Sequence, residues 1–183
     1  MRRADGVSDR FESDRLSFRP QRVEDAEALF EAYSDHDLMR WWSSAPHATV
    51  AETVAYLTPK PDEKPWRGWS ITLKGDDRAI GTLAATETKP HVFEIGYLLA
   101  RSRWGHGCAR EAVARLLDRL FREEGARRVF ADTDPENDAS MRLLETLGFR
   151  REGLLRQEWE THIGVRDSVI WGLLRDEWVA RRG

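Results

Sequence analysis

The N-terminal part of the chain alternates between a strand pattern and helical patterns. Over 15–19 apolar and polar residues alternate, which predicts a short strand that Pro20 ends. Apolar residues then recur with helical spacing over 23–33, which predicts an amphipathic helix. Two shorter helices are predicted over 35–42 and 50–57, with a polar loop between them.

The middle of the chain predicts three strands followed by a long helix. The strands cover 66–73, 79–88 and 92–100, and Gly75-Asp76-Asp77 between the first two is a hairpin signal. A strongly periodic apolar stripe then begins at Ala109 and predicts a helix that ends at Gly125.

The C-terminal part predicts a strand, a helix and a closing hairpin. The strand covers 128–133 and the helix 138–147, and the hairpin strands cover roughly 149–160 and 165–174. A helix between the strands 92–100 and 128–133 predicts a parallel crossover inside an otherwise antiparallel sheet. The pattern therefore predicts an α/β (α+β) fold with a mixed, mostly antiparallel seven-stranded sheet.

Composition narrows the class of protein without naming a function. The chain has 183 residues, of which 40% are hydrophobic and 33% charged, an ordinary balance for one globular domain. We expect a flexible lead-in over 1–12 and a single domain over 13–183. A net charge of −3 gives no overall basic field for nucleic acid.

Cysteine, histidine and hydropathy exclude several other sites. Cys108 is the only cysteine, which excludes an intramolecular disulfide and a Cys-rich metal site, and the five His show no metal-ligand spacing. We therefore expect no metal. No apolar stretch reaches the length of a bilayer span, and residues 1–10 are too polar for a secretory signal. We expect a cytoplasmic protein without a membrane or nucleic-acid partner.

A glycine-containing turn between a strand and a helix is the first candidate site. Small residues let a ligand approach the backbone closely, and the following helix N-terminus directs N–H groups and positive charge at it. Such a turn suits a phosphate or pyrophosphate, although two glycines also suit a plain tight turn. The segment is Trp104-Gly105-His106-Gly107-Cys108-Ala109.

A second candidate segment follows some thirty residues later. Asn137 is a good helix N-cap and Gly148 a good residue just past a helix end. Met141, Leu144 and Leu147 form a core stripe between them. Taken alone, this segment has a structural explanation.

Together, in this order, the two segments resemble the acyl-CoA N-acyltransferases of the GNAT superfamily. That family's pyrophosphate loop reads Gln/Arg-x-x-Gly-x-Gly/Ala, and residues 104–109 match it except at the first position, where Trp104 stands. A Trp there is typical of the ribosomal-protein-alanine N-acetyltransferase (RimJ/RimL-like) branch. Other features of that branch, which extend the likeness from residue 12 almost to the end, are Arg15-Leu…Arg19-Pro20, Glu94-Ile-Gly-Tyr97, Asn137-x-x-Ser140…Leu147-Gly148-Phe149 and Glu152-Gly153-x-x-Arg156…Asp167…Glu177-Trp178.

The resemblance implies a GNAT fold in which acetyl-CoA, the acetyl donor, lies where two parallel strands splay apart. These are the strands that end at Ala100 and Thr133. It also implies that Asn137 binds the pantetheine arm and that Ser140 lies near the thioester sulfur. The cofactor-binding residues that it implies are Leu98, Leu99, Ala100, Trp104, Gly105, His106, Gly107, Cys108, Ala109, Asn137 and Ser140.

Acetyl transfer to an amine requires a base, an oxyanion donor and an acid. An α-amine has a pKa of about 8 and a lysine about 10.4, so a base must help to make the attacking amine neutral. We assign Glu94 as this base, a backbone N–H such as that of Leu98 as the oxyanion donor, and Ser140 as the acid. Trp41 and Trp42 are the candidate substrate-binding residues.

Each assignment has a plainer alternative. Glu94 also fits an outward-facing strand residue, Ser140 a polar residue of a first helical turn, and Trp41 and Trp42 core packing. Cys108 as an acyl-accepting nucleophile is a minor alternative. We expect a protein or peptide N-terminus as acceptor and leave open a homodimer. The competing functions are acetylation of an antibiotic, polyamine or amino acid, a non-catalytic acyl-CoA sensor, and a nucleotide-binding regulator.

Overall fold

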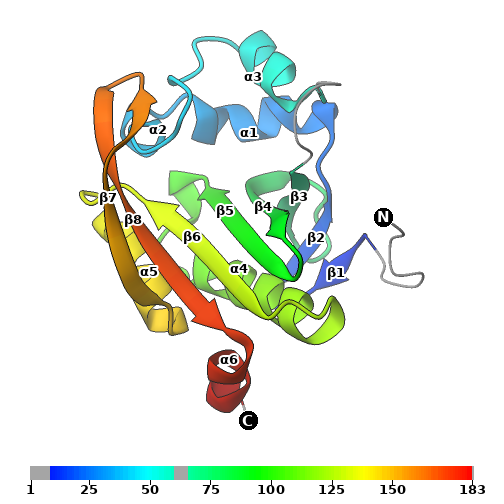
Figure 1. Ribbon diagram of the computed structural model, residues 1–183. Helices are drawn as coiled ribbons and strands as arrows, with labels where there is room; N and C mark the ends of the chain where they lie inside the picture. Colours follow the sequence, from blue (N-terminus) through cyan, green and yellow to red (C-terminus); the bar gives the residue numbers. More distant parts are fainter. Residues whose placement is uncertain (1–8, 60–65, 183) are drawn as a thin grey trace.

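The sheet of this protein is a mixed, open sheet with helices on both faces (Figure 1). The computed structural model describes residues 9–59 and 66–182. Its eight strands, in the order β1-β2-β3-β4-β5-β6-β8-β7, are β1 (Phe11–Glu12), β2 (Leu16–Pro20), β3 (Arg67–Leu73), β4 (Ala79–Lys89), β5 (Val92–Leu99), β6 (Arg128–Thr133), β7 (Arg150–Thr161) and β8 (Gly164–Leu174). The helices are η1 (Val23–Asp25), α1 (Ala26–Tyr33), α2 (His36–Met39), α3 (Val50–Leu57), η2 (Arg101–Arg103), α4 (Cys108–Asp118), η3 (Arg119–Glu123), α5 (Asp138–Leu147) and α6 (Arg175–Arg182).

The class of fold is confirmed, but the strand count is eight and not seven. The additional strand is β1, which pairs antiparallel with β2. Phe11 in β1 is buried and its ring stacks on Phe18 at 4.6 Å between centroids. A two-residue strand is too short to show a period, so the prediction of a flexible lead-in through residue 12 missed it. Residues 1–8 of that lead-in lie outside the described residues.

Four helices differ from their predictions. The predicted helix 23–33 begins as a 3₁₀ turn over Val23–Asp25 and is α-helical from Ala26. The predicted helix 35–42 begins at His36, because Asp35 caps it by accepting from the N–H groups of Asp37 and Leu38, and it ends at Met39. The long helix predicted to end at Gly125 is α-helical to Asp118 and widens into a π-helical turn over 119–123. The C-terminal α6 was not predicted at all.

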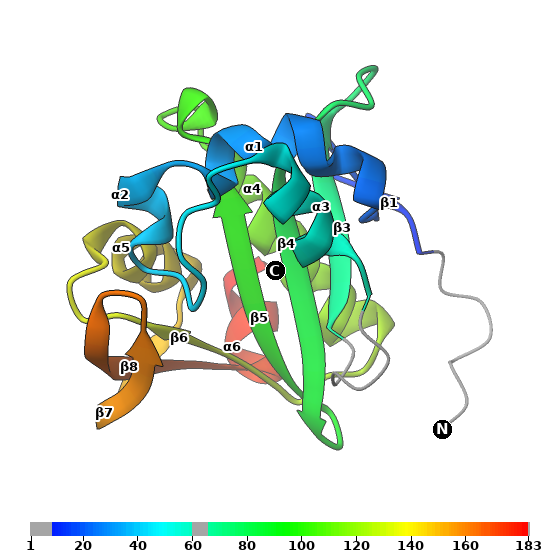
Figure 2. The same ribbon diagram turned by 90° about the horizontal axis from the view of Figure 1, so that it is seen from above.

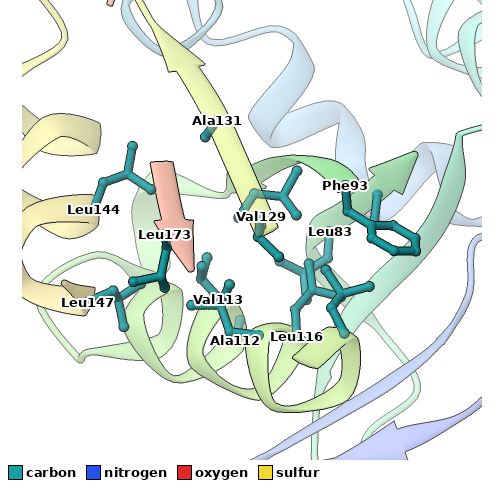
Figure 3. Packing of buried hydrophobic residues seen from close by; sticks show 14 of the residues in the cluster. Leu83, Phe93, Ala112, Val113, Leu116, Val129, Ala131, Leu144, Leu147 and Leu173 are labelled. Carbon is teal, nitrogen blue, oxygen red and sulfur yellow. The ribbon is translucent and has the colours of Figure 1, made fainter. Parts of the chain in front are cut away.

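Two clusters of buried side chains hold the helices against the two faces. The larger cluster packs α4 and α5 on the sheet, and Figure 3 shows Val113 and Leu116 of α4 beneath Val129 and Phe93. The smaller cluster joins α1 and α2 to Leu98 and Ala100 on the other face. In Figure 1, α1, α2 and α3 lie above the sheet and α4 lies below it.

The one parallel pair of the described sheet, β5 and β6, separates along its length. Its register runs only from Val92 with Arg128 to Glu94 with Phe130. Beyond that point β5 stays paired with β4 as far as Leu99, and β6 with β8 as far as Thr133. Both views show the strands diverging toward their C-terminal ends (Figures 1 and 2). The sheet is thus open in its centre, between helices that cover both faces.

Candidate active site

A cavity of about 1180 Å³ occupies the opening between β5 and β6. Its walls come from both strands, from α5, from the turn before α4, and from the segment around α2. Ligand pockets are commonly about 300–1,000 Å³ in volume, so this cavity has room for a long ligand and a second molecule. The predicted site residues that line it are Trp41, Trp42, Glu94, Leu98, Leu99, Trp104, Gly105, Gly107, Cys108, Ala109, Asn137 and Ser140.

Two of the predicted cofactor residues, Ala100 and His106, are not among the lining residues. The N–H of Ala100 donates to Ile80 O at 2.9 Å, and its side chain is buried against α1 and α2. His106 is exposed, and its carbonyl accepts a hydrogen bond from Arg15. The structure therefore leaves neither side chain pointing at the cavity.

The backbone of β5 presents alternate residues to the opening. Because the N–H of Ala100 faces β4, the main-chain groups of Leu98 also face β4, where Leu98 pairs with Thr82. The N–H groups of Tyr97 and Leu99 face the opposite way, toward β6. An oxyanion in the opening would therefore meet Tyr97 or Leu99, and not Leu98 as the sequence suggested.

The turn before α4 has the backbone geometry that suits an anion. Gly105 and Gly107 have φ values of 79° and 75°, in the left-handed region that disfavours side chains, and Gly107 is the N-cap residue of α4. A Cβ on Gly105 would meet nothing within 4 Å, so the backbone stands open to the cavity there. The turn and the α4 N-terminus together fit a pyrophosphate.

Arg15 braces this turn from the edge of β2. Its Nη1 donates to His106 O at 2.9 Å, and its Nε donates to Glu111 Oε2 at 2.6 Å in the first turn of α4. Ser13 also donates to Glu111, at 2.7 Å. Trp104 is fixed in the same way, since its Nε1 donates to Leu99 O at 2.9 Å. The loop is thus held by Ser13 and Arg15 from the segment before β2, and by the bond of Trp104 to β5.

Asn137 and Ser140 lie at the start of α5, on the other side of the opening. The side-chain oxygen of Asn137 accepts the N–H of Ser140 at 3.2 Å, so Asn137 is the N-cap that the spacing predicted. The Tyr97 hydroxyl is buried and makes no hydrogen bond of ordinary geometry with any described residue. Burial raises the pKa of Tyr97 to about 12, and the nearby Ser140 opposes that rise. Tyr97 and Ser140 therefore form one polar group beside the cavity.

Glu94 enters the cavity from the opposite face of β5. Three positions separate it from Tyr97, so the two side chains point to opposite faces of the sheet. No described residue forms an ion pair or hydrogen bond with the Glu94 carboxylate. Burial, and then the charge of Asp132, raise the pKa of Glu94 above its ordinary value. A carboxylate with a raised pKa is a better proton acceptor near neutral pH.

Trp41 and Trp42 follow α2 and form part of an aromatic wall. Trp42 Nε1 donates to Tyr56 Oη at 3.1 Å, and the Arg40 guanidinium lies 4.9 Å from the Trp41 ring centre. Both Trp are half-buried and line the cavity. Each can therefore pack against the protein with one part of its ring and contact a bound molecule with another. Trp66 completes the wall.

Among the polar lining residues that sequence reasoning missed, three lie together on β6, β7 and β8. Asp132 is on β6, Trp159 on β7 and Ser168 on β8, and all three line the opening. Trp159 Nε1 donates to Asp132 Oδ2 at 2.9 Å. A polar residue between the buried Ala131 and Thr133 was the signal available for Asp132, but the other two depend on how the hairpin folds back.

The described residues contain neither a metal-binding cluster nor a membrane-spanning helix. No group of three or more His, Cys, Asp or Glu side chains is arranged to hold a metal ion over 9–59 and 66–182. Within the same ranges, no helix is both long and apolar enough to cross a bilayer.

Comparison with known proteins places this geometry among acetyltransferases. A family model described as "Acetyltransferase (GNAT) domain" matches residues 15–150. The Bacillus licheniformis protein named "Uncharacterized N-acetyltransferase p20" is 32% identical over 171 residues, which is 91% of this chain and 96% of that protein. The crystal structure of a GNAT-family acetyltransferase from Bacillus anthracis superposes with a TM-score of 0.82 at 26% identity, over 92% of this chain and 99% of that one.

Two more distant structures share the fold. The ribosomal-protein-S5-alanine acetyltransferase from Vibrio fischeri has a TM-score of 0.72 at 23% identity, over 92% of this chain and 98% of that one. The spermidine N-acetyltransferase from Vibrio cholerae, solved with CoA and spermine, has a TM-score of 0.75 at 20% identity, over 90% and 98%.

Proposed function

The chain belongs to the GNAT family of acetyltransferases, and from that premise we propose that it moves an acetyl group from acetyl-CoA directly to the N-terminal α-amine of a protein or peptide. The family accounts for the type of reaction, which is acyl transfer to an amine. The acceptor and the residue roles rest on the cavity described above.

The observation that carries the proposal is the placement of two functional groups on opposite faces of one opening. Glu94 faces the side of α1 and α3, whereas Ser140 and Tyr97 lie on the side of α5. A thioester that lies between β5 and β6 would meet a base on one face and a proton donor on the other. This is the arrangement that attack on one side and departure on the other require.

The reaction then proceeds in one displacement. The neutral amine nitrogen bonds to the thioester carbonyl carbon, and Glu94 accepts the proton that this nitrogen loses, directly or through a water. An N–H of Tyr97 or Leu99 stabilises the negative oxygen of the tetrahedral intermediate. The carbon–sulfur bond breaks, and Ser140 supplies the proton that the leaving thiolate takes up. Solvent water then returns a proton to Ser140 and takes up the one that Glu94 accepted.

The turn before α4 supports the choice of donor. Gly105, Gly107 and the α4 N-terminus fit the pyrophosphate of a CoA molecule, and Arg15 holds the turn in place. When bound, acetyl-CoA supplies the activated acetyl group, and the chain itself positions that group. Cys108 is buried at the start of α4, which favours a loop-packing role over that of an acyl carrier.

The resemblance to the ribosomal-protein-alanine branch favours a protein acceptor, and the Vibrio fischeri enzyme belongs to that kind by its name. A small cationic amine is the second candidate, favoured by the spermidine N-acetyltransferase from Vibrio cholerae and by the carboxylates in the cavity. A sensor without turnover is the third. A homodimer is the assembly that the resemblance favours, and sedimentation of the purified protein tests it.

The test is amine-dependent release of CoA thiol from acetyl-CoA. Peptides that differ only at the first residue, the same peptides with a blocked N-terminus, and a set of small amines serve as acceptors. Release with free but not blocked peptides supports the proposal. Release with small amines alone would mean that the acceptor is a small amine and not a protein N-terminus. Binding of acetyl-CoA without release of thiol on any amine supports the sensor.

A further inference from the structure

The part of the cavity lined by Glu94, Asp132, Asp134 and Glu136 has more carboxylates than paired cations among the described residues. We call it the acceptor end of the cavity. Arg166 pairs with Asp134 at 2.7 Å and with Glu136 at 3.1 Å, and Arg40 also reaches Glu136, at 3.4 Å. Glu94 and Asp132 line the same space, and no Lys, Arg or His within the described ranges forms an ion pair with either. Both carboxylates are half-buried, and charges partly removed from water are normally paired, so a cationic ligand would supply what no described residue supplies.

Asp132 is held in a fixed place by the β7–β8 hairpin. The pairing of β7 with β8 is irregular between Leu155 and Trp159, where Gln157 has a φ of 54°. The N–H of Gln157 donates to Asp167 Oδ1 at 2.8 Å, which fixes the bulge. The bulge brings Trp159 Nε1 to Asp132 at 2.9 Å. One oxygen of the carboxylate is therefore occupied by a neutral donor.

A second observation marks the same place as a ligand site. Ser168 is only 1% exposed, lines the cavity, and its Oγ makes no hydrogen bond of ordinary geometry with any described residue. It lies near enough to Asp132 to lower the pKa of that carboxyl, although burial raises it overall. Unsatisfied buried hydroxyls are uncommon in native proteins. Asp132 and Ser168 together thus offer acceptor oxygens that a cationic N–H group can use.

The register separates Asp132 from Glu94 by a defined step. Glu94 lies beside Phe130, and Asp132 is two residues further along β6 on the same face. Two residues of strand span about 6.6 Å. An acceptor with a second cation a few bonds from the reacting amine can therefore meet both carboxylates.

We propose that Asp132 is a specificity-determining residue that binds a second positive charge of the acceptor, while Glu94 serves the amine that is acetylated. The preferred acceptor is then a primary amine with a cationic group a few bonds from the reacting nitrogen. A short diamine and a peptide with lysine as its second residue both have this chemistry. The inference rests on the proposed acetyl transfer for its reaction but not for its binding site.

The experiment compares matched acceptors in wild type and Asp132→Asn. Diaminobutane is compared with pentylamine, and the peptide Ala-Lys-Ala-Ala with its norleucine counterpart. In wild type the dications have the lower KM. In D132N the KM of the dications rises about tenfold or more, as expected for loss of a charge-assisted contact, while the KM of the monocations changes little and kcat changes by the same factor for both kinds of acceptor. Glu160→Gln, which removes an exposed charge of strand β7 that does not line the cavity, is the control and leaves the preference unchanged.

A binding measurement separates the two proposals. Calorimetric titration of diaminobutane into the enzyme loaded with CoA needs no turnover, and D132N should abolish or strongly weaken it. Asp132-dependent binding without turnover would support this inference and contradict acetyl transfer. Two results would overturn this inference and leave acetyl transfer in place. One is that D132N still turns over dications with a lower KM than monocations. The other is that D132N raises the KM of monocations and dications by the same factor. Comparing the diamine with the lysine peptide shows whether the second positive charge belongs to a small diamine or to a peptide.

Discussion

At the scale of single residues, the site is marked by groups whose charge or proton has no partner among the described residues. Glu94 makes no ion pair there, and the Tyr97 hydroxyl is buried without a hydrogen bond of ordinary geometry. Such groups reduce stability and are kept where a ligand completes them. Both border the opening between β5 and β6, which supports a reaction there.

The pKa of Glu94 predicts the acidic limb of the pH profile. Because burial and then Asp132 raise this pKa, kcat/KM should fall with decreasing pH at a higher pH than for an ordinary glutamate. D132N removes the negative charge beside Glu94 and so lowers the pKa of Glu94. The fall of kcat/KM therefore moves to lower pH in D132N. Glu94→Gln loses about 100-fold or more in kcat, with acetyl-CoA affinity retained, and keeps only the fall in kcat/KM that protonation of the acceptor amine causes. A second fall in E94Q that cannot be ascribed to the acceptor amine would assign the base to another residue.

The sequence was informative about residues in a motif and not about residues that meet through folding. Glu94, Ser140 and Asn137 were named from their place in a pattern, and all three line the cavity. Asp132 and Trp159 are 27 residues apart and meet only because a bulge in β7 turns the indole inward. The direction of the Leu98 N–H depends on which alternate residues of β5 hydrogen-bond to β4. The residue types along β5 do not indicate which residues these are.

At the scale of elements, the turn that joins β5 to α4 combines backbone conformation with support from β2. Gly105 and Gly107 supply the left-handed conformations, and Arg15 fixes the turn through His106 O and Glu111. The turn is therefore preformed, which reduces the entropy lost on binding an anion.

Gly105→Ala should weaken acetyl-CoA binding, and Gly75→Ala is its matched control. Both glycines have left-handed φ values, 79° and 83°, and neither Cβ would meet an atom within 4 Å. Each substitution should therefore cost a similar free energy of unfolding, roughly 1–2 kcal/mol. Only Gly105 borders the cavity, so calorimetry should show acetyl-CoA affinity reduced on the order of tenfold in G105A alone. Equal affinities in the two variants would remove the turn from the binding site.

Periodic elements were predicted more accurately than short or capped ones. The helices 50–57 and 138–147 and the strand 128–133 have their predicted bounds. β1 and α6 were missed because each is anchored by one buried aromatic residue, Phe11 or Trp178, in a polar segment. Side-chain packing at a distance decides such elements, and the local pattern does not contain it.

At the scale of the whole molecule, a buried ion pair joins segments on the α1 side of the sheet. Arg19 Nη2 lies 2.6 Å from Asp25 Oδ1, and their side chains are only 4% and 7% exposed. Ser70 of β3 donates to the same carboxylate at 2.6 Å, and Arg19 Nε reaches Asp77 in the β3–β4 turn at 2.6 Å. The pair thus fixes β2, η1 and β3 relative to one another.

Arg19→Met should lower the free energy of unfolding by about 3–5 kcal/mol, because it leaves the buried Asp25 charge without its partner. Arg142→Met is the control, since Arg142 and Asp138 form an i,i+4 pair that is 79% and 70% exposed. That change should stay within about 0.5 kcal/mol. Urea denaturation measures both. Similar losses in the two variants would mean that Arg19 does not tie these segments together.

The central claim is direct acetyl transfer in the opening between β5 and β6. A single-turnover experiment with acetyl-labelled acetyl-CoA, excess enzyme and a free-amine peptide tests it most directly, with the label followed on peptide and protein. We predict label on the peptide α-amine without prior label on the protein, and a much slower transfer in E94Q at equal acetyl-CoA binding. Label that appears first on Cys108, or wild-type binding of acetyl-CoA with no transfer to any amine, would contradict the account.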